Sequence, residues 1–380
     1  MPRRRLHRLA RALAPSLLAG LLLTACNEPG PPPEPPLPEG ALEAVAVEPG
    51  VPREALARRV DALFAGENIG ETRAVVVMHG GEVVAERYAE GFDADTRFIG
   101  WSMTKTVTGL LVGLLVSDGR MRLDDPAPVP RWQRPGDPRG EITLRHLMQM
   151  RSGLRHAENA DPIYSSSEVR MMYRDGASDM AGWAEAQPLD FAPGTHFQYS
   201  TATSVILADI VTRALVPNGS PAERQQAMAE FLASRLAEPA RLESLVGEYD
   251  PRGTLVGGSL GWADARDWAR LGELLRNNGS VAGVQVVPRG WTTFMREASP
   301  ASPDYGGQIW LNHDSGTDRD VLFADQGPDD AFALVGHLGQ YVIVVPSRKL
   351  TIARLGKTDS DQRDALVDAL AEIVALYPER

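Results

Sequence analysis

The sequence predicts an α+β fold, in which one antiparallel sheet is built from both ends of the chain and flanked by the terminal helices. A mostly helical domain is inserted between the two halves of the sheet. Three observations carry this prediction. Strand-like runs rich in Val occur at residues 72–91 and again at 329–356, and the long segment between them is largely helical in pattern. An amphipathic helix lies before the first run and another after the last, so the simplest packing joins both chain ends in one sheet.

The first part of the sheet domain is assigned to residues 51–135. A helix is expected over 51–66, where Pro52 suits the first turn and the apolar residues Leu56, Val60, Leu63 and Phe64 share one face. Residues 72–91 then predict a hairpin that turns at Gly80-Gly81. An apolar helix follows over residues 100–119.

The inserted helical domain is assigned to residues 136–284. A short helix is expected within 141–154 and ends at Gly153. Residues 155–195 are rich in loops, with helical pieces around Met171 and Trp183. Three more helices are expected over 199–215, 221–240 and 263–279.

The second part of the sheet domain is assigned to residues 285–380. It contains three successive strand patterns and a closing helix with Leu366, Leu370, Ile373 and Tyr377 on one side. The strand patterns lie at 329–340, 341–349 and 350–356. A ligand cleft is expected where the sheet meets the helical insertion.

The N-terminus predicts a targeting segment followed by a spacer. Residues 1–25 combine an arginine-rich start with a short apolar run, as a signal peptide does. The run ends in Leu23-Thr24-Ala25-Cys26, which resembles a bacterial lipobox, and Cys26 is the only cysteine in the chain. An ordinary signal peptide with a chance cysteine is the alternative. Residues 26–50 are rich in proline and predict an extended linker.

These features predict a lipid-anchored protein of the cell envelope. A lipidated Cys26 would hold the folded body at a membrane, and Asn27 in the next position favours the outer membrane, facing the periplasm. With one cysteine, the chain forms no internal disulfide, and its stability must come from the core.

Charge and motif content exclude several classes of protein. The chain carries 39 basic and 50 acidic residues, a net charge of −11, so it lacks the basic surface of a nucleic-acid-binding protein. No two of the seven histidines stand at metal-ligand spacing, and the chain contains neither a P-loop nor a G-x-G-x-x-G motif. We expect no metal and no cofactor.

The strongest chemical signal is a lysine inside the apolar helix. Only three of the 39 basic residues are lysines, namely Lys105, Lys349 and Lys357. Arginine cannot be deprotonated in a protein, whereas a buried lysine can, so a lysine kept in an apolar helix suggests that the amine itself is needed. Burial among apolar neighbours is expected to lower the pKa of Lys105.

Ser102 lies three residues before Lys105, so both side chains are expected on one face of the helix. A neutral Lys105 could then take the proton from the Ser102 hydroxyl, which is a poor nucleophile by itself. The alternative is that Lys105 extends to solvent and Ser102 caps the helix.

Beyond S-x-x-K, the chain resembles the serine β-lactamase-related superfamily, and most closely its class C-like branch of esterases and 6-aminohexanoate-dimer hydrolases. The similar blocks span most of residues 70–356 in the family order. They are "TRFIGWSMTKTVTGLLVGLLVSDGRMRLDDP", "ITLRHLMQMRSGL", "PGTHFQYSTATSVILADIV", "GGSLGWADARDWARLGELLRNNG" and "ALVGHLGQYVIVVPSRKLTIARLG". The resemblance implies the β-lactamase/transpeptidase-like fold.

The resemblance also implies roles for individual residues. Ser102 would be the acylated nucleophile, Lys105 its proton acceptor, and Tyr199 the tyrosine of the family's Tyr-x-Asn or Tyr-x-Ser motif. A phenol beside a cationic amine is expected to have a lowered pKa and to relay protons. The third motif position is Thr201, which keeps a hydroxyl but loses the amide that contacts β-lactams.

The family's Lys-Thr-Gly strand is absent, and "LVGHLGQY" stands in its place. In one register, Gly336 is the motif glycine and the N–H of His337 completes an oxyanion hole with the N–H of Ser102. In the other, 337–339 is the motif, Gly339 is its glycine and Gln340 supplies the N–H. We favour the first, since a glycine before that N–H lets the substrate approach closely.

A second serine pattern competes with S-x-x-K. Residues 257–261 read Gly-Gly-Ser-Leu-Gly and formally match the nucleophile elbow of α/β-hydrolases, with Ser259 as nucleophile and His337 downstream. Because no buried strand is expected directly before it and Gly261 delays the helix, a glycine-rich loop near the cleft is the favoured interpretation.

The sequence therefore predicts a serine hydrolase that cleaves an ester or amide bond of a small molecule through an acyl-enzyme at Ser102. Without the Lys-Thr-Gly residues that help bind a carboxylate, a substrate without an essential carboxylate is favoured. A true β-lactamase or D-alanyl-D-alanine carboxypeptidase is one alternative, and a non-catalytic envelope binding protein on the same scaffold is another.

Overall fold

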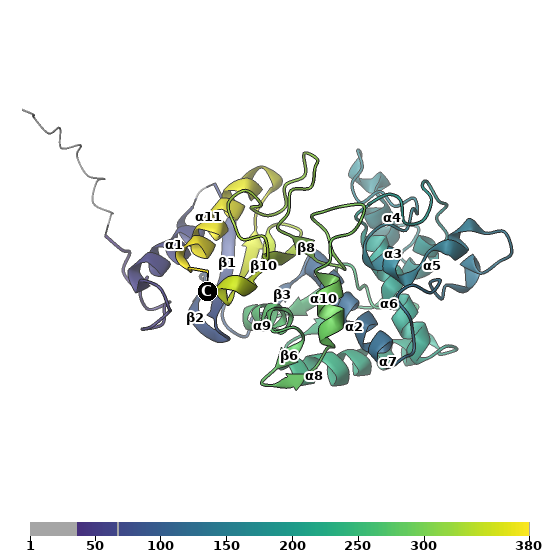
Figure 1. The fold of residues 1–380 in the computed structure, drawn as a ribbon, viewed down its shortest axis with the longest axis horizontal. Helices are drawn as coiled ribbons and strands as arrows, with labels where there is room; N and C mark the ends of the chain where they lie inside the picture. The colour runs from purple at the N-terminus through teal and green to yellow at the C-terminus, as the bar shows by residue number, and fades with distance from the viewer. Residues whose placement is uncertain (1–35, 67, 380) are drawn as a thin grey trace, which may run out of the picture. The chain divides into compact units, whose positions relative to one another are not determined.

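The computed structural model describes residues 36–66 and 68–379. The described chain from Leu37 onward forms one compact unit around a six-stranded antiparallel sheet, with the strand order β2-β1-β11-β10-β9-β8 (Figure 1). The strands are β1 (Glu71–His79), β2 (Glu82–Tyr88), β8 (Trp310–Leu311), β9 (Phe332–Gly336), β10 (Gln340–Val345) and β11 (Leu350–Lys357). Since β1 pairs with β11 along its whole length, both chain ends meet in one sheet, and the predicted α+β class is confirmed.

Two hydrophobic cores cover the two faces of this sheet. On β1, Val75 and Val77 point into one core, while Ala74, Val76 and Met78 point into the other. A strand buried on both faces needs apolar residues at consecutive positions, which explains the unbroken run Ala-Val-Val-Val-Met.

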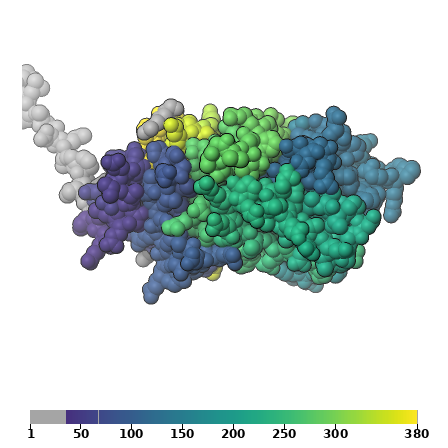
Figure 2. Space-filling model, turned by 90° about the horizontal axis from the view of Figure 1, so that it is seen from below, coloured from purple at the N-terminus to yellow at the C-terminus, as the bar shows by residue number. Residues whose placement is uncertain are grey.

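The terminal helices cover one face of the sheet. Helices α1 (Arg53–Ala65) and α11 (Arg363–Leu376) pack against each other there, so these two segments from opposite ends of the chain lie side by side (Figures 1 and 2). Their buried faces carry the predicted residues, including Leu56 and Leu63 on α1 and Leu366 and Ile373 on α11.

The opposite face of the sheet is covered by α9 (Ala265–Arg276), which packs on β1, β10 and β11. Gly272 allows this close packing, because a Cβ there would lie 2.7 Å from side-chain atoms of both Thr351 and Val342. The predicted boundary at residue 284 assigned this helix to the inserted domain, whereas its packing joins it to the sheet.

Part of the segment expected as a linker over residues 26–50 packs against the sheet. Ala46 N–H donates to Val84 O at 2.9 Å and Glu86 N–H donates to Ala44 O at 2.8 Å, so this segment pairs with β2. Val45 is 3% exposed there. The pairing covers the edge of an outer strand, whose backbone groups would otherwise lack partners. The predictions for residues 1–25 and for Cys26 lie outside the described residues.

Helix α2 (Thr104–Ser117) is enclosed between the sheet and the helical part. Its residues 104–115 are all buried, which is the behaviour expected of a helix that is apolar all round. It packs against α6 (Thr201–Leu215). The helix was predicted from residue 100, but a 3₁₀ turn, Trp101–Met103, precedes it.

Short elements complete the rest of the chain. The helices are α3 (Leu144–Met148), α4 (Ser167–Tyr173), α5 (Met180–Glu185), α7 (Pro221–Leu232), α8 (Glu238–Ala240) and α10 (Arg289–Met295). Two small sheets are formed by β3 (Phe98–Ile99), β5 (Gly261–Ala263) and β4 (Val246–Gly247), and by β6 (Ser280–Val281) and β7 (Val284–Gln285). Over the described part of the chain, none of the helices combines the length and apolar character needed to span a membrane.

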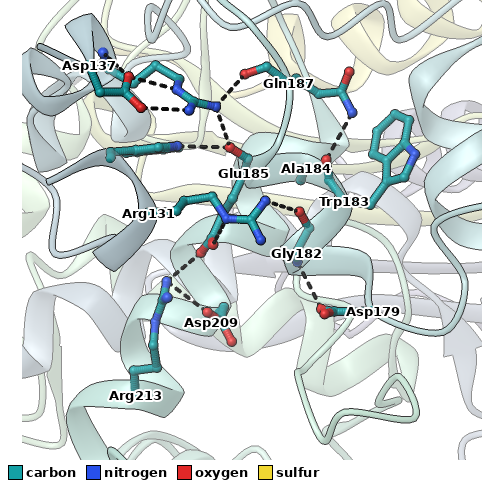
Figure 3. A network of polar contacts seen from close by, with 12 residues as sticks. Arg131, Asp137, Asp179, Gly182, Trp183, Ala184, Glu185, Gln187, Asp209 and Arg213 are labelled. Atoms are coloured by element: carbon teal, nitrogen blue, oxygen red, sulfur yellow. Dashed lines mark hydrogen bonds and ion pairs between the residues drawn. The ribbon is translucent and has the colours of Figure 1, made fainter. Parts of the chain in front are cut away.

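A network of buried ion pairs joins α5 to α6 in the helical part (Figure 3). Arg213 lies 2.5 Å from a carboxylate oxygen of Glu185 and 2.8 Å from one of Asp209. Burial raises the pKa of Glu185 to about 7, although the charge of Arg213 opposes this shift. The side chain of Glu185 is 6% exposed, so its charge depends on the contact with Arg213.

Candidate active site

Ser102 lies on the 3₁₀ turn between β3 and α2 and is partly exposed. The backbone before it is anchored, because Gly100 N–H donates to Gly261 O at 2.8 Å and Gly100 O accepts from Met103 N–H at 3.1 Å. Trp101 has φ of 46°, a conformation that is strained for a bulky side chain. The surrounding structure thus holds the residue before Ser102 in a conformation that it rarely adopts.

Lys105 is buried directly behind Ser102, with a side-chain exposure of 1%. Its Nζ donates to Ser102 Oγ at 2.9 Å, to Thr201 Oγ1 at 2.8 Å and to Gly258 O at 2.8 Å. The three donors of an ammonium are therefore matched by three oxygens. The alternative in which Lys105 extends to solvent is wrong, and the predicted contact between Lys105 and Ser102 is present.

Sequence reasoning missed Glu158, which lies on the loop between α3 and α4. Its carboxylate accepts from Thr201 N–H at 2.7 Å and from Thr201 Oγ1–H at 2.5 Å. One of its oxygens is 3.9 Å from Lys105 Nζ. Glu158 is 43 residues from Thr201 in the chain, and no spacing rule connects the two, so only the fold could reveal this contact.

A second carboxyl group lies close to Glu158 and Lys105. Burial and the neighbouring charge of Glu158 together raise the pKa of Glu168, on α4, to about 7, against the opposing effect of the Lys105 charge. The site thus contains two acids and one amine within mutual electrostatic reach. Neither acid was singled out from the sequence.

Tyr199 lies beside the amine, with its ring centroid 4.7 Å from Lys105 Nζ. Its ring stacks on Trp310, with the centroids 5.2 Å apart. The lowered pKa expected from the sequence is wrong in sign. Burial raises the pKa of Tyr199, and this outweighs the charge of Lys105 and the neighbouring Ser102 hydroxyl, which lower it. Tyr199 is therefore a neutral phenol at neutral pH.

The end of β9 lies against the turn that carries Ser102. A Cβ on Gly336 would be 2.2 Å from Gly100 O, so only glycine lets the two backbones approach this closely. The ring of His337 packs edge-on against Trp101, with the centroids 5.6 Å apart. These contacts place Gly336 and His337, the residues of the favoured register, next to the turn of Ser102.

Gly339 occupies a different place in the same hairpin. Its φ is 77°, and a Cβ there would meet Thr358, Arg354 and Leu366. The side chain of Gln340 points back into the turn and donates to His337 O and Leu338 O, both at 3.0 Å. Gly339 and Gln340 thus shape the turn 337–339, whereas Gly336 is the glycine that meets the backbone of Gly100.

The competing serine at residue 259 lies in a loop, as favoured from the sequence. Ser259 is 1% exposed, and α9 begins only at Ala265, so the strand-serine-helix arrangement of a nucleophile elbow is not formed here. A Cβ on Gly258 would be 2.6 Å from Thr201 O. Because residue 258 is a glycine, its backbone can lie this close to Thr201, and its carbonyl oxygen reaches Lys105. This packing explains the second glycine of the Gly-Gly-Ser-Leu-Gly stretch.

Comparisons with known proteins identify the family. The sequence model of the β-lactamase family matches residues 67–376, and the chain belongs to this family, as its motifs predicted. A 6-aminohexanoate-dimer hydrolase of Paenarthrobacter ureafaciens is 30% identical over 264 residues, which cover 65% of this chain and 63% of the relative. Esterase EstB of Burkholderia gladioli is 35% identical over 184 residues, 42% of this chain and 45% of the esterase. The chain thus spans less than two thirds of either relative.

Solved structures share the fold. A penicillin-binding protein homologue from Caulobacter crescentus superposes with a TM-score of 0.60 at 18% identity, covering 84% of this chain and 97% of its own. A family VIII carboxylesterase gives a TM-score of 0.61 at 16% identity, with coverage of 84% and 97%. The β-lactamase/transpeptidase-like fold is therefore confirmed.

Proposed function

We propose that this protein is a serine hydrolase that cleaves ester or amide bonds through an acyl-enzyme at Ser102. The observation that carries the proposal is the hydrogen bond of 2.9 Å between Ser102 Oγ and Lys105 Nζ, an amine that is 1% exposed. A buried amine in contact with a partly exposed hydroxyl is an arrangement that can activate a serine.

The first half of the reaction is acylation. Ser102 Oγ attacks the carbonyl carbon of the substrate while its proton passes to a neutral Lys105 Nζ. The negative charge that forms on the carbonyl oxygen is stabilised by the backbone N–H groups of Ser102 and His337. Tyr199, as a neutral phenol in contact with both Ser102 and Lys105, donates a proton to the leaving group and recovers it from Lys105.

The second half is hydrolysis of the acyl-enzyme. A water molecule attacks the acyl carbon and loses its proton to the same groups, Ser102 Oγ is released, and the acid product leaves. Acylation and deacylation thus use one set of proton-transfer groups in opposite directions.

We propose a small ester or amide as the substrate. Its binding does not depend on a substrate carboxylate held at the end of β9. That strand ends at Gly336 and is followed by His337 and Leu338, so it supplies no lysine or threonine there. The relatives named as an esterase and as a 6-aminohexanoate-dimer hydrolase support ester and amide bonds as the substrate class. We propose that the reaction takes place in the cell envelope, with Cys26 as the lipidated anchor to the outer membrane.

Labelling with a fluorophosphonate probe tests the mechanism. The full chain should be labelled at Ser102, and Ser102→Ala should abolish both labelling and hydrolysis of p-nitrophenyl butyrate. Lys105→Arg keeps the positive charge but removes the base, so activity should fall by about 10²-fold or more. Labelling that survives in the Ser102→Ala protein would overturn the proposal.

A substrate panel separates the alternatives. Purified protein would be compared on nitrocefin, p-nitrophenyl esters of increasing acyl length, aminohexanoate oligomers and a D-alanyl-D-alanine peptide. Turnover of esters or oligomers with slow or no turnover of nitrocefin is expected. Efficient nitrocefin or dipeptide cleavage would instead identify a β-lactamase or a carboxypeptidase, and binding without turnover of any compound would favour a binding protein.

A further inference from the structure

Thr201 lies between two titratable groups and contacts both. On one side it is 2.8 Å from Lys105 Nζ, and on the other its hydroxyl is 2.5 Å from a carboxylate oxygen of Glu158. Its backbone N–H holds the second carboxylate oxygen at 2.7 Å. Thr201 is the first residue of the 15-residue helix α6, so the carboxylate lies at a helix N-terminus, where negative charge is favoured.

The direction of these hydrogen bonds follows from the number of protons. A hydroxyl has one proton, an ammonium can only donate, and a carboxylate can only accept. The Thr201 hydroxyl must therefore accept from Lys105 and donate to Glu158. The result is a continuous chain of hydrogen bonds from Ser102 through Lys105 and Thr201 to Glu158.

We propose that Thr201 and Glu158 form a proton relay that converts Lys105 from an ammonium into the neutral amine that activates Ser102. The proposal rests on the function proposed above. One proton moves from Lys105 Nζ to Thr201 Oγ1 while the hydroxyl proton of Thr201 moves to Glu158. The amine loses its positive charge, the carboxylate becomes a carboxylic acid, and Thr201 is unchanged. Rotation of the neutral amine about its Cε–Nζ bond then turns the lone pair of Lys105 towards Ser102 Oγ, 2.9 Å away.

The relay explains why a hydroxyl stands at position 201. The family motif there reads Tyr-x-Asn or Tyr-x-Ser. An asparagine amide oxygen can accept from Lys105, but an amide does not pass a proton onward as a hydroxyl does. In this chain the carboxylate of Glu158 contacts that hydroxyl directly, so the threonine and the glutamate form one functional unit.

The charged groups facing Glu158 act in opposite directions: the charge of Glu168 favours proton uptake by the pair of acids, whereas Lys105 and the N-terminus of α6 favour the carboxylate. Glu168 approaches from α4, Lys105 from α2, and the phenols of Tyr199 and Tyr305 also feel the charge of Glu158. Two neighbouring carboxylates repel each other, so adding one proton to the pair relieves that repulsion. Glu158 is thus a positioning residue and proton acceptor that acts through Thr201.

The test measures the rate constant of fluorophosphonate labelling of Ser102 from about pH 5 to pH 10 in the full chain. Glu158→Gln keeps an oxygen acceptor for Thr201 but removes the proton acceptor, and Thr201→Val removes the hydroxyl at nearly constant shape. Both should slow labelling at neutral pH by about 10²-fold, the scale of one proton-transfer group. Both should regain rate towards the alkaline end of this range, since hydroxide can then remove the proton from the amine without the relay.

Three controls make the result specific. Thr201→Ser should restore most of the rate lost in Thr201→Val, because it returns the hydroxyl. The double variant Glu158→Gln/Thr201→Val should be no slower than either single variant, since the two substitutions interrupt the same proton relay. Glu141→Gln, at an exposed glutamate outside the site, should behave as the parent chain.

Each outcome is decisive. If the parent is labelled at Ser102 and Glu158→Gln retains both its rate and its pH profile, the relay is overturned while the serine hydrolase stands. The same holds if Thr201→Ser is as slow as Thr201→Val, or if the rates of the slow variants do not recover at alkaline pH. If the parent itself is not labelled at Ser102, the proposed function fails instead.

Discussion

Replacing Gly336 by alanine should disable the proposed oxyanion hole while leaving Ser102 and Lys105 in place. The new Cβ would lie 2.2 Å from Gly100 O, and this oxygen belongs to backbone that cannot rotate away as a side chain can. To reach ordinary van der Waals contact, β9 and the turn before Ser102 must separate by about 1–2 Å. The gap opens between the two N–H groups that are proposed to hold the same oxygen.

The size of the effect follows from this displacement. Donors in an oxyanion hole act at about 2.7–3.1 Å, so a shift of about 1–2 Å breaks one of the two hydrogen bonds. Loss of one donor lowers kcat by about 10²–10³-fold, equivalent to about 3–4 kcal/mol of transition-state stabilisation. KM for p-nitrophenyl butyrate should change little, since the hydrogen bond strengthens chiefly in the transition state.

The assay is steady-state hydrolysis of p-nitrophenyl butyrate, with thermal unfolding measured on the same samples. Gly290→Ala is the matched control, because a Cβ there meets nothing within 4 Å and the residue lies in helix α10. Gly339→Ala, at φ of 77°, should lower the unfolding temperature through backbone strain. Near-parental kcat for Gly336→Ala would refute the reasoning, and a kcat loss confined to Gly339→Ala would support the alternative register.

Three further predictions concern pH, an ion pair and the turn after β9. Burial lowers the pKa of His156 to about 4, so the unfolded chain binds more protons between that value and the ordinary 6.5, and stability falls as the pH falls through this range. His156→Gln should remove up to about 3 kcal/mol of the loss in unfolding free energy between neutral and acidic pH, measured by urea unfolding at both. An unchanged pH dependence of the unfolding free energy would contradict this prediction. Arg213→Met should lower the free energy of unfolding, measured in urea, by about 3 kcal/mol at alkaline pH and by less in acid, where Glu185 becomes protonated. Equal losses at both pH values would argue against a buried charge on Glu185. Gln340→Ala frees the carbonyls of His337 and Leu338, so kcat should fall with KM retained, whereas a rise in KM alone would assign the turn to substrate binding.

The main secondary structure could be predicted because its signals are local. The hairpin at Gly80-Gly81 and the closing helix with Leu366 and Leu370 need only the spacing of apolar residues and glycines to be recognised. The start of α2 was misplaced by four residues, since the 3₁₀ turn before it depends on the left-handed conformation of Trp101. Nothing in the local sequence marks a tryptophan for that conformation.

The candidate site likewise contains features that the sequence could predict and features that it could not. The pair Ser102 and Lys105 could be recognised because i, i+3 spacing on a helix is a local property, and because lysine is rare in this chain. Tyr199 was identified only through the family motif, and the sign of its pKa shift was wrong because burial depends on the packing of Trp310 and Tyr305 around it.

The amino-acid sequence alone was thus sufficient for the elements of the fold, for its family and for the contact between Ser102 and Lys105, because each rests on residues close together in the chain or on motifs in order. The contact of Glu158 with Thr201 and the approach of Gly336 to Gly100 required the folded chain. Both depend on distances between segments far apart in sequence, and these distances are set by how α6 and β9 pack against α2 and the turn before it.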